Sequence, residues 1–235
     1  MPSVYMVFPY MDHDLMGLME NQKVRLTIPH IKLYMLQLLE GTAYMHRNKI
    51  LHRDMKASNL LINNEGKLLI ADFGLARPYE PSERRDMTPL VVTRWYRPPE
   101  LLIGESKYTE AIDMWGVGCI FAEMLMKRPL FPGNSDLHQL ELIFQMCGTP
   151  DQSTWPGWES LGNTTIASDI KTRYPRKLRG HFQRYDEHAA DLLDMLLQLN
   201  PARRLRAEEA LDHAFFKSPP FPARPEEMPK FESSH

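Results

Sequence analysis

The spacing of apolar residues divides most of the chain into helices. Between Ile31 and Met45 apolar positions recur every three or four residues, the period of an amphipathic helix, and Thr27 precedes them as a candidate N-cap. Residues 108–127 are apolar on nearly every face, which predicts a buried central helix. Further helices are expected at residues 135–147, 186–199 and 206–216. The chain is therefore predicted to be mainly α with a small β component.

The N-terminal residues combine a strand pattern with a break. Residues 3–8 (S-V-Y-M-V-F) are β-branched and aromatic, so they predict a short buried strand. Pro9, Tyr10 and Met11 interrupt this pattern, and residues 12–20 begin a short helix. Taken without the rest of the sequence, this is an ordinary strand–turn–helix with no ligand of its own.

Composition narrows the class of protein only slightly. The 235 residues are 43% hydrophobic and 25% charged, as in an ordinary globular protein. A net charge of −2 argues against broad electrostatic binding to nucleic acid or to a membrane surface, and no apolar run is long enough to span a bilayer. Cys119 and Cys147 fall within apolar helical patterns, so we expect both to be reduced core residues.

Chemically informative residues gather in one loop. Residues 50–59 read I-L-H-R-D-M-K-A-S-N, and D-F-G follows at residues 72–74. These residues at this spacing are the ones that phosphoryl transfer by a protein kinase requires. Asp54 would accept the proton of an attacking hydroxyl, and Lys56 would neutralise the transferring phosphoryl group. Read alone, the H-R-D triplet would also suit a structural turn with a charged rim.

A small hairpin connects this loop to the D-F-G triplet. Residues 60–62 (L-L-I) and 67–70 (K-L-L-I) are mostly apolar and flank a polar turn, which predicts two short antiparallel strands. The hairpin would set Asn59 and Asp72 at its two ends, so that side chains distant in sequence converge. Their oxygen atoms would hold the Mg²⁺ ions that bridge the phosphates of ATP.

A further motif identifies the family. Residues 91–100 read V-V-T-R-W-Y-R-P-P-E, which resembles the corresponding segment of cyclin-dependent kinases and their relatives. The resemblance covers residues 4–216 and is closest to the transcription-elongation branch, especially its fungal members. Three further segments support that branch: Y-M-D-H-D-L at residues 10–15, K-A-S-N at residues 56–59, and P-P-F-P-A at residues 219–223.

The resemblance assigns roles around residues 91–100. Thr93 would bridge Asp54 and Lys56, as in kinases that prefer serine or threonine over tyrosine. Val92 and Arg97 would form a pocket that accepts proline after the target residue.

It also assigns two structural contacts. Glu100 would form an ion pair with Arg204. Asp113, a carboxylate within the apolar central helix, needs hydrogen-bond donors, and the resemblance implies that these are backbone N–H groups of the catalytic loop.

The same resemblance places a nucleotide site at the N-terminus. Phe8 would be the gatekeeper residue. The Pro9 carbonyl and the Met11 backbone would bond the adenine edge, and Asp14 would lie near the ribose.

Residues 72–100 have the length and composition of an activation segment. Its centre, residues 80–87, is polar and charged, so we expect mobility until a modification fixes it. Thr88 is the candidate phosphorylation site, with Arg53 and Arg77 as cationic partners of a phosphate that carries about −1.5 to −2 charges. An ordinary loop threonine is the alternative.

The implied domain organisation is a protein-kinase C-terminal lobe with one strand of the N-terminal lobe. Residues 1–14 would form that last strand and the hinge, and residues 15–217 the C-lobe, with an irregular insert at residues 148–185. Residues 218–235 would be an extended tail with no pattern to bury. The rest of the N-lobe is expected to be missing, because the sequence contains no G-x-G-x-x-G loop and no lysine in a V-A-I-K-like strand.

Two functional hypotheses follow from the resemblance. The first is a cyclin-dependent, nuclear Ser/Thr kinase that uses ATP and Mg²⁺ on Ser-Pro sites of the RNA polymerase II C-terminal repeats and of elongation factors. The 235 residues alone would then be inactive, and the activity would belong to a longer chain. The second is a non-catalytic binding module that competes for substrates or partners. The intact Asp54, Lys56, Asn59 and Asp72 favour the first.

Overall fold

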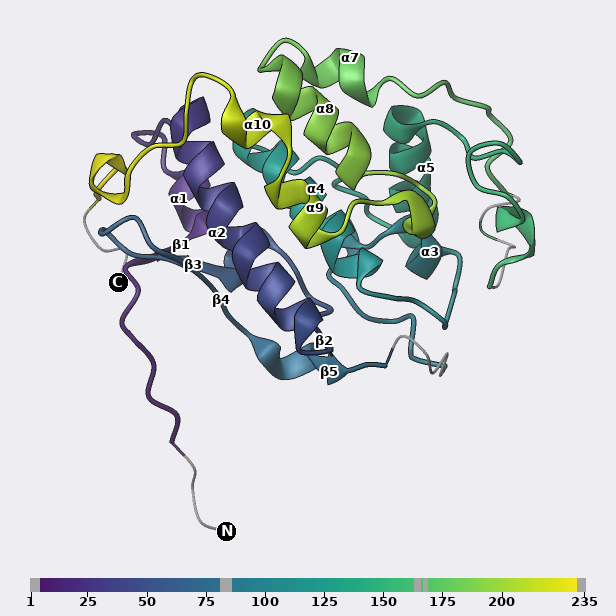
Figure 1. The fold of residues 1–235 in the computed structure, drawn as a ribbon. Coiled ribbons are helices and arrows are strands. Elements are labelled where there is room, and N and C mark those ends of the chain that lie inside the picture. Colours follow the sequence, from purple (N-terminus) through teal and green to yellow (C-terminus); the bar gives the residue numbers. More distant parts are fainter. Residues whose placement is uncertain (1–4, 81–85, 163–165, 167–168, 232–235) are drawn as a thin grey trace.

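The structure, a computed structural model, describes residues 5–80, 86–162, 166 and 169–231. Helices make up most of it, with two small sheets at one side (Figure 1). The coarse prediction of a mainly α fold with few strands is confirmed. Among the described residues, no helix is both long enough and apolar enough to cross a membrane.

Two long helices form the centre of the fold. Helix α2 (Ile28–Arg47) begins after Thr27, whose backbone N–H donates to the ring of His30. Helix α4 (Ala111–Met126) is buried along almost its whole length, as its apolar sequence predicts. Helix α4 packs against α2 and against α8 (Glu187–Leu196), so the core lies between these three helices.

Shorter helices surround this centre (Figure 1). Helix α9 packs on α2, α7 packs on α8, and α5 packs on α3. The bounds of these elements are α1 (Leu15–Glu20), α3 (Pro99–Leu102), α5 (Asp136–Cys147), α7 (Leu178–Phe182), α9 (Ala207–Leu211) and α10 (Ala214–Lys217). Cys119 and Cys147 are buried and free, as expected.

The strands are short and antiparallel. One sheet has the order β1 (His13–Asp14), β3 (Leu60–Ile62) and β4 (Leu68–Ile70), in which the last two form the predicted hairpin. The other pairs β2 (Ile50–Leu51) with β5 (Arg77–Pro78) and so joins the start of the catalytic loop to the activation segment.

The predicted N-terminal strand is wrong over its described part. Residues 5–10 are extended but pair with no strand among the described residues, and their side chains are exposed, including Val7 at 95%. Figure 1 shows this segment leaving the body of the molecule. A strand is stable only when its backbone N–H and C=O groups find a neighbouring strand, and the described part of the chain places none there. The predicted short helix also begins later, at Leu15, because His13 and Asp14 pair with β3.

The prediction of a tail with nothing to bury is also wrong. Ala223 and Met228 are buried, and Lys32, itself fully buried, donates to the carbonyls of Ser218 and Pro220 at 2.8 and 2.7 Å. The sequence hides this packing because part of it is made through backbone carbonyls, which leave no periodic apolar pattern. The tail therefore packs against the start of α2, and its last described residue, Phe231, bonds through its backbone to Asn64 in the hairpin turn.

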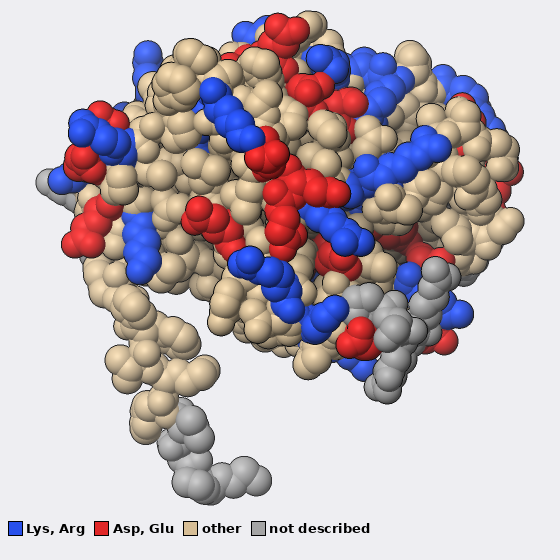
Figure 2. All heavy atoms as spheres, viewed as in Figure 1, with Lys and Arg blue, Asp and Glu red and all other residues tan. Residues whose placement is uncertain are grey.

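Charge is mixed over the surface. On the face shown in Figure 2, basic and acidic side chains are interspersed. This distribution agrees with the small net charge of −2.

Candidate active site

The Asp54 carboxylate lies at the centre of the candidate site. Only 6% of the residue is exposed, and its Oδ1 accepts hydrogen bonds from the backbone N–H and the hydroxyl of Thr93 at 3.1 and 2.9 Å. Its Oδ2 lies 2.7 Å from Lys56 Nζ. Burial raises the pKa of Asp54, but the contacts with Lys56 and Thr93 outweigh it and leave the pKa below its ordinary value. The carboxylate is therefore ionised at neutral pH.

Lys56 completes a three-residue contact with Asp54 and Thr93. Its Nζ donates to Thr93 Oγ1 at 3.1 Å as well as contacting Asp54. The bridge expected from the sequence is thus present. The threonine comes from residues 91–97, so this contact fixes the activation segment against the catalytic loop.

A buried carboxylate in the first turn of α4 accepts hydrogen bonds from the catalytic loop. Asp113 is 1% exposed, and its two oxygens accept from the backbone N–H groups of His52 and Arg53, each at 2.9 Å. These bonds hold Arg53 at a φ of +66°, a strained conformation for a residue with a side chain. His46 Nε2 lies 2.9 Å from the same carboxylate. Sequence analysis expected the backbone donors but missed His46, which occupies the same face of α2 as the core positions.

Helix α4 approaches this loop very closely. A Cβ atom added at Gly116 would lie 2.7 Å from the Cβ of Met55, closer than real atoms come. The glycine therefore allows the central helix to touch the catalytic loop, and it serves packing rather than nucleotide binding.

Asn59 and Asp72 come together through the hairpin. The N–H of Ala71 donates to the Asn59 carbonyl at 2.8 Å, which places Asp72 one residue from this pairing. Asn59 Nδ2 donates to the Asp54 carbonyl at 2.9 Å and so leaves the amide oxygen for a cation. Asp72 is exposed, has a left-handed backbone, and accepts from the Gly74 N–H at 3.2 Å.

These two residues fit a magnesium site better than a closed protein cage. Among the described residues, no cluster of three or more His, Cys, Asp and Glu side chains is arranged to hold a metal. Mg²⁺ commonly takes one or two protein oxygen ligands and completes its octahedron with water and substrate phosphates. An amide oxygen and an exposed carboxylate meet that requirement.

The residues expected around the nucleotide are much less enclosed. Phe8 is 72% exposed and Pro9 is also exposed, so the described structure builds no gatekeeper pocket around them. Met11 is buried, and the Asp14 side chain caps α1 by accepting from Gly17 N–H at 2.9 Å. Phe73 of the D-F-G triplet is half exposed and touches the His52 ring edge-to-face.

Thr88 is linked to the catalytic loop by a residue that sequence analysis missed. The Tyr108 hydroxyl donates to the Thr88 carbonyl at 2.9 Å and accepts from Arg53 Nη1 at 3.1 Å. Arg53 also donates to the Leu75 carbonyl, whereas Arg77 is exposed on β5. Residues 80–87 were expected to be mobile, and most of them, residues 81–85, lie outside the described residues.

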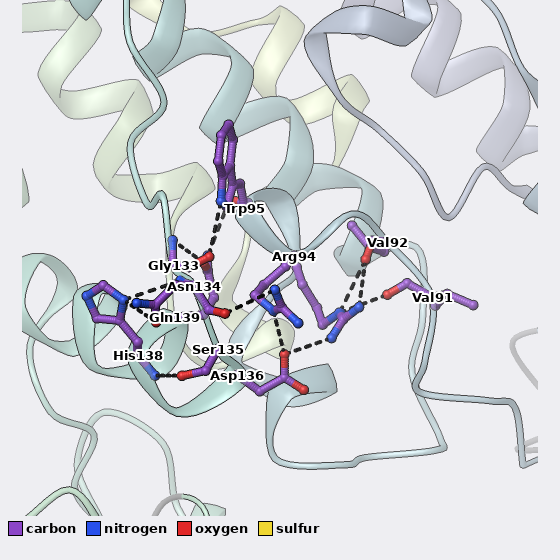
Figure 3. Close-up of polar contacts among 11 residues, drawn as sticks. Val91, Val92, Arg94, Trp95, Gly133, Asn134, Ser135, Asp136, His138 and Gln139 are labelled. Carbon is purple, nitrogen blue, oxygen red and sulfur yellow. Dashed lines mark hydrogen bonds and ion pairs between the residues drawn. The ribbon is translucent and has the colours of Figure 1, made fainter.

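Hydrogen bonds join Val92 to Arg97, and Figure 3 shows the Val91 and Val92 carbonyls that accept them. Val92 has a φ of +67°, and its carbonyl accepts from Arg97 Nε and Nη2 at 3.2 and 3.0 Å. The Val91 carbonyl accepts from the same Nε at 3.0 Å. The Val92 carbonyl is therefore directed toward Arg97.

Glu100 and Arg204 form a buried ion pair at 2.8 Å, with both side chains almost fully inaccessible to solvent. Arg204 also donates to the carbonyl of Ala111 and lies over the Trp115 ring. The pair joins α3 to the 3₁₀ turn at Pro201–Arg203 and to the start of α4. Its contacts are those of a structural element.

Comparison with known proteins identifies the class. The protein kinase domain family matches residues 1–216, which is more than half of the chain. The chain therefore belongs to the protein kinase family, as its fold and the residues around Asp54 indicate.

The relatives include serine/threonine-protein kinases and a probable cyclin-dependent kinase. The serine/threonine-protein kinase bur1 of Neurospora crassa is 55% identical over 100% of this chain and 43% of its own length. The probable cyclin-dependent kinase 9 of Schizosaccharomyces pombe is 51% identical over 99% of this chain and 41% of its own length. The chain thus spans less than half of these curated relatives.

A solved structure agrees with both comparisons. The crystal structure of the yeast RNA Pol II CTD kinase CTDK-1 complex superposes with a TM-score of 0.88 at 40% identity. The match covers 92% of this chain and 71% of that one.

Proposed function

We propose that the chain is the catalytic C-lobe of a cyclin-dependent Ser/Thr kinase that transfers the γ-phosphate of ATP to Ser-Pro or Thr-Pro sites. The observation that carries the proposal is the buried Asp54 carboxylate held between Lys56 and Thr93. A site kept only for binding needs no ionised carboxylate beside a lysine and two candidate metal ligands. Family membership supports the same conclusion.

In the proposed reaction Asp54 positions the substrate hydroxyl and accepts its proton. The hydroxyl oxygen forms a bond to the γ-phosphorus while the bond from that phosphorus to the bridging oxygen of ADP breaks. Lys56 offsets negative charge on the transferring group, and its contact with Thr93 keeps the ammonium beside Asp54. Mg²⁺, held by Asn59 and Asp72, would neutralise the phosphates.

The preference for proline follows from Val92. Because Arg97 already occupies the Val92 carbonyl, that carbonyl is a poor acceptor for the N–H of the residue after the target. A buried N–H without a partner costs about 1–3 kcal/mol. Proline has no N–H and escapes this cost.

We further propose that phosphorylation of Thr88 activates the enzyme. Thr88 is exposed, and the Tyr108 hydroxyl already links its backbone to Arg53. A phosphate there would attract Arg53 and Arg77 and would fix the activation segment next to the catalytic loop.

We propose that the 235 residues alone are inactive and that a longer chain supplies the remainder of an N-lobe. The exposed Phe8 and Pro9 and the missing glycine-rich loop support this proposal. Similarity to a cyclin-dependent kinase and to an RNA Pol II CTD kinase supports a cyclin partner, action on the RNA polymerase II C-terminal domain and nuclear localisation. Action on elongation factors is proposed from the sequence resemblance alone.

Phosphate transfer from radiolabelled ATP to a Ser-Pro peptide tests the proposal. The longer chain with its cyclin should label the peptide, while the isolated 235-residue chain should not. Absence of transfer by the cyclin-bound longer chain, with binding of the peptide intact, would instead favour the competitor module. Turnover by the isolated chain near the usual kinase range of about 1–100 s⁻¹ would show that no further lobe is needed.

A further inference from the structure

Asp136, the first residue of α5, contacts the proposed proline pocket from a separate element (Figure 3). Its Oδ1 accepts from Arg97 Nη1 at 3.1 Å and from Arg94 Nε at 3.0 Å. Arg97 uses its other nitrogens on the Val91 and Val92 carbonyls. One guanidinium thus connects residues 91 and 92 to the carboxylate of α5.

The planar guanidinium makes this connection directional. Along one edge of the guanidinium, Nε and Nη2 of Arg97 donate to the Val92 carbonyl. The orientation of the plane is fixed only if the remaining Nη1 also has an acceptor. Asp136 supplies that contact, and the Arg97 side chain is only 14% exposed. Burial lowers the pKa of Arg97, and Asp136 opposes this fall, which favours the charged form that donates best.

The carboxylate itself is held by a well-connected loop. Gly133 accepts from the Trp95 indole at 3.1 Å, and its N–H donates to the Gln139 side chain at 3.0 Å. Ser135 caps α5 by accepting from the His138 N–H at 3.1 Å. These bonds, shown in Figure 3, anchor the residues on both sides of Asp136.

The strained backbone at Val92 explains why a second anchor matters. A β-branched residue at a φ of +67° is strained and persists only where its surroundings hold it. Releasing Arg97 from Asp136 would let the guanidinium turn away from the Val92 carbonyl. The carbonyl could then accept the N–H of a residue other than proline.

We propose that Asp136 is a positioning residue that sets the selectivity of the site for proline after the target residue. This inference rests on the proposed kinase function. Asp136 does not touch the reacting atoms, so its removal should change discrimination between substrates more than the turnover of the preferred one.

The experiment compares kcat/KM for a Ser-Pro peptide and the matched Ser-Ala peptide, using the longer cyclin-bound protein. Asp136→Asn should lower the Pro/Ala ratio about tenfold, because a charge-assisted hydrogen bond becomes a weaker neutral one. Most of the change should be a gain on Ser-Ala. Asp136→Glu should restore most of the ratio, because it retains the charge.

Two controls separate this role from a merely structural one. Asp194→Asn removes a similar half-buried partner of an arginine, Arg176, away from the pocket, and should leave the ratio unchanged. Arg94→Gln removes the second arginine that donates to Asp136, so that Arg97 is its remaining arginine partner. The Pro/Ala ratio of this variant should be at or above that of the wild type. A thermal midpoint for each variant establishes that it is folded.

A folded Asp136→Asn variant with the wild-type Pro/Ala ratio would overturn the inference while leaving the kinase proposal intact. A wild-type enzyme that transfers phosphate without preferring proline would overturn it as well. Loss of transfer by the wild type to every Ser peptide would instead contradict the proposed function.

Discussion

The acceptor side of the proposed site, formed by Asp54, Lys56 and Thr93, and the nucleotide side, formed by residues 5–10 and Phe73, are held very differently. Asp54 is 6% exposed and has partners from several elements, whereas Phe8 is 72% exposed and lies on an extended segment that joins no sheet among the described residues. The family resemblance assigns roles to residues on both sides. The difference teaches that a motif predicts chemistry, while the packing partners of the motif decide whether its geometry is present.

Asp113→Ala tests the support of the acceptor side and carries the largest expected loss of stability. It would leave the backbone N–H groups of His52 and Arg53 buried without an acceptor, at about 1–3 kcal/mol each. Chemical denaturation should therefore show a loss of about 2–6 kcal/mol. Asp212→Ala, at an exposed aspartate paired with Lys217, should leave the free energy of unfolding almost unchanged. Equal effects of the two variants would show that the loop is not supported in this way.

Met228→Ala tests whether the tail braces the hairpin that carries Asn59 and Asp72. Met228 is 3% exposed and lies against the turn at Gly66. Truncating a buried methionine usually costs about 2–5 kcal/mol, and we expect the lower half of that range because the site lies near the surface. Met16→Ala, at a methionine that is 40% exposed, is the control in the same denaturation series. A negligible loss of unfolding free energy in Met228→Ala would show that the tail is not buried, as its sequence predicts.

Acid titration examines the electrostatics of the acceptor side. The folded-state pKa of Asp54 lies below its ordinary value, so the stability that this group contributes is complete above about pH 4 and is lost as pH falls through the folded pKa. Lys56→Met removes a lowering contact, so the Asp54 pKa should rise in an NMR titration of the carboxyl group. An unchanged pKa would mean that Lys56 does not determine the charge of Asp54.

Phe8→Ser addresses the nucleotide side and should have the smallest effect. The side chain is already in solvent, so the free energy of unfolding of the 235-residue chain should change by less than about 0.5 kcal/mol. The same substitution at Phe131, which is 1% exposed, should cost about 3–5 kcal/mol. A comparable loss at Phe8 would indicate that the N-terminal segment packs in solution.

Features that depend on nearby residues could be predicted from the sequence. The period of α2, the apolar surface of α4 and the turn of the β3–β4 hairpin are local patterns, and each element is present. The contacts of Asp113 and of the Glu100–Arg204 pair join residues distant in sequence, and they were expected only because the chain resembles cyclin-dependent kinases.

Other features that depend on distant partners, outside those that the family resemblance implies, could not be predicted from the sequence. The strand pattern of residues 3–8 carries no information on whether a neighbouring strand is present. The tail is held through carbonyls by Lys32 and through backbone groups by Asn64, and a carbonyl has no sequence signature. The roles of Tyr108 and Asp136 could not be predicted for a similar reason, because their partners, Arg53 and Arg97, are at least 39 positions away.

Single-turnover phosphate transfer by an Asp54→Asn variant of the longer, cyclin-bound protein tests the central claim most directly. Asparagine keeps the shape of the side chain but cannot take the proton, so the rate should fall about 10²–10⁴-fold. The thermal midpoint and the affinity for ATP should change little. A variant that transfers phosphate at the wild-type rate would remove Asp54 from the proposed role and contradict the account of the site.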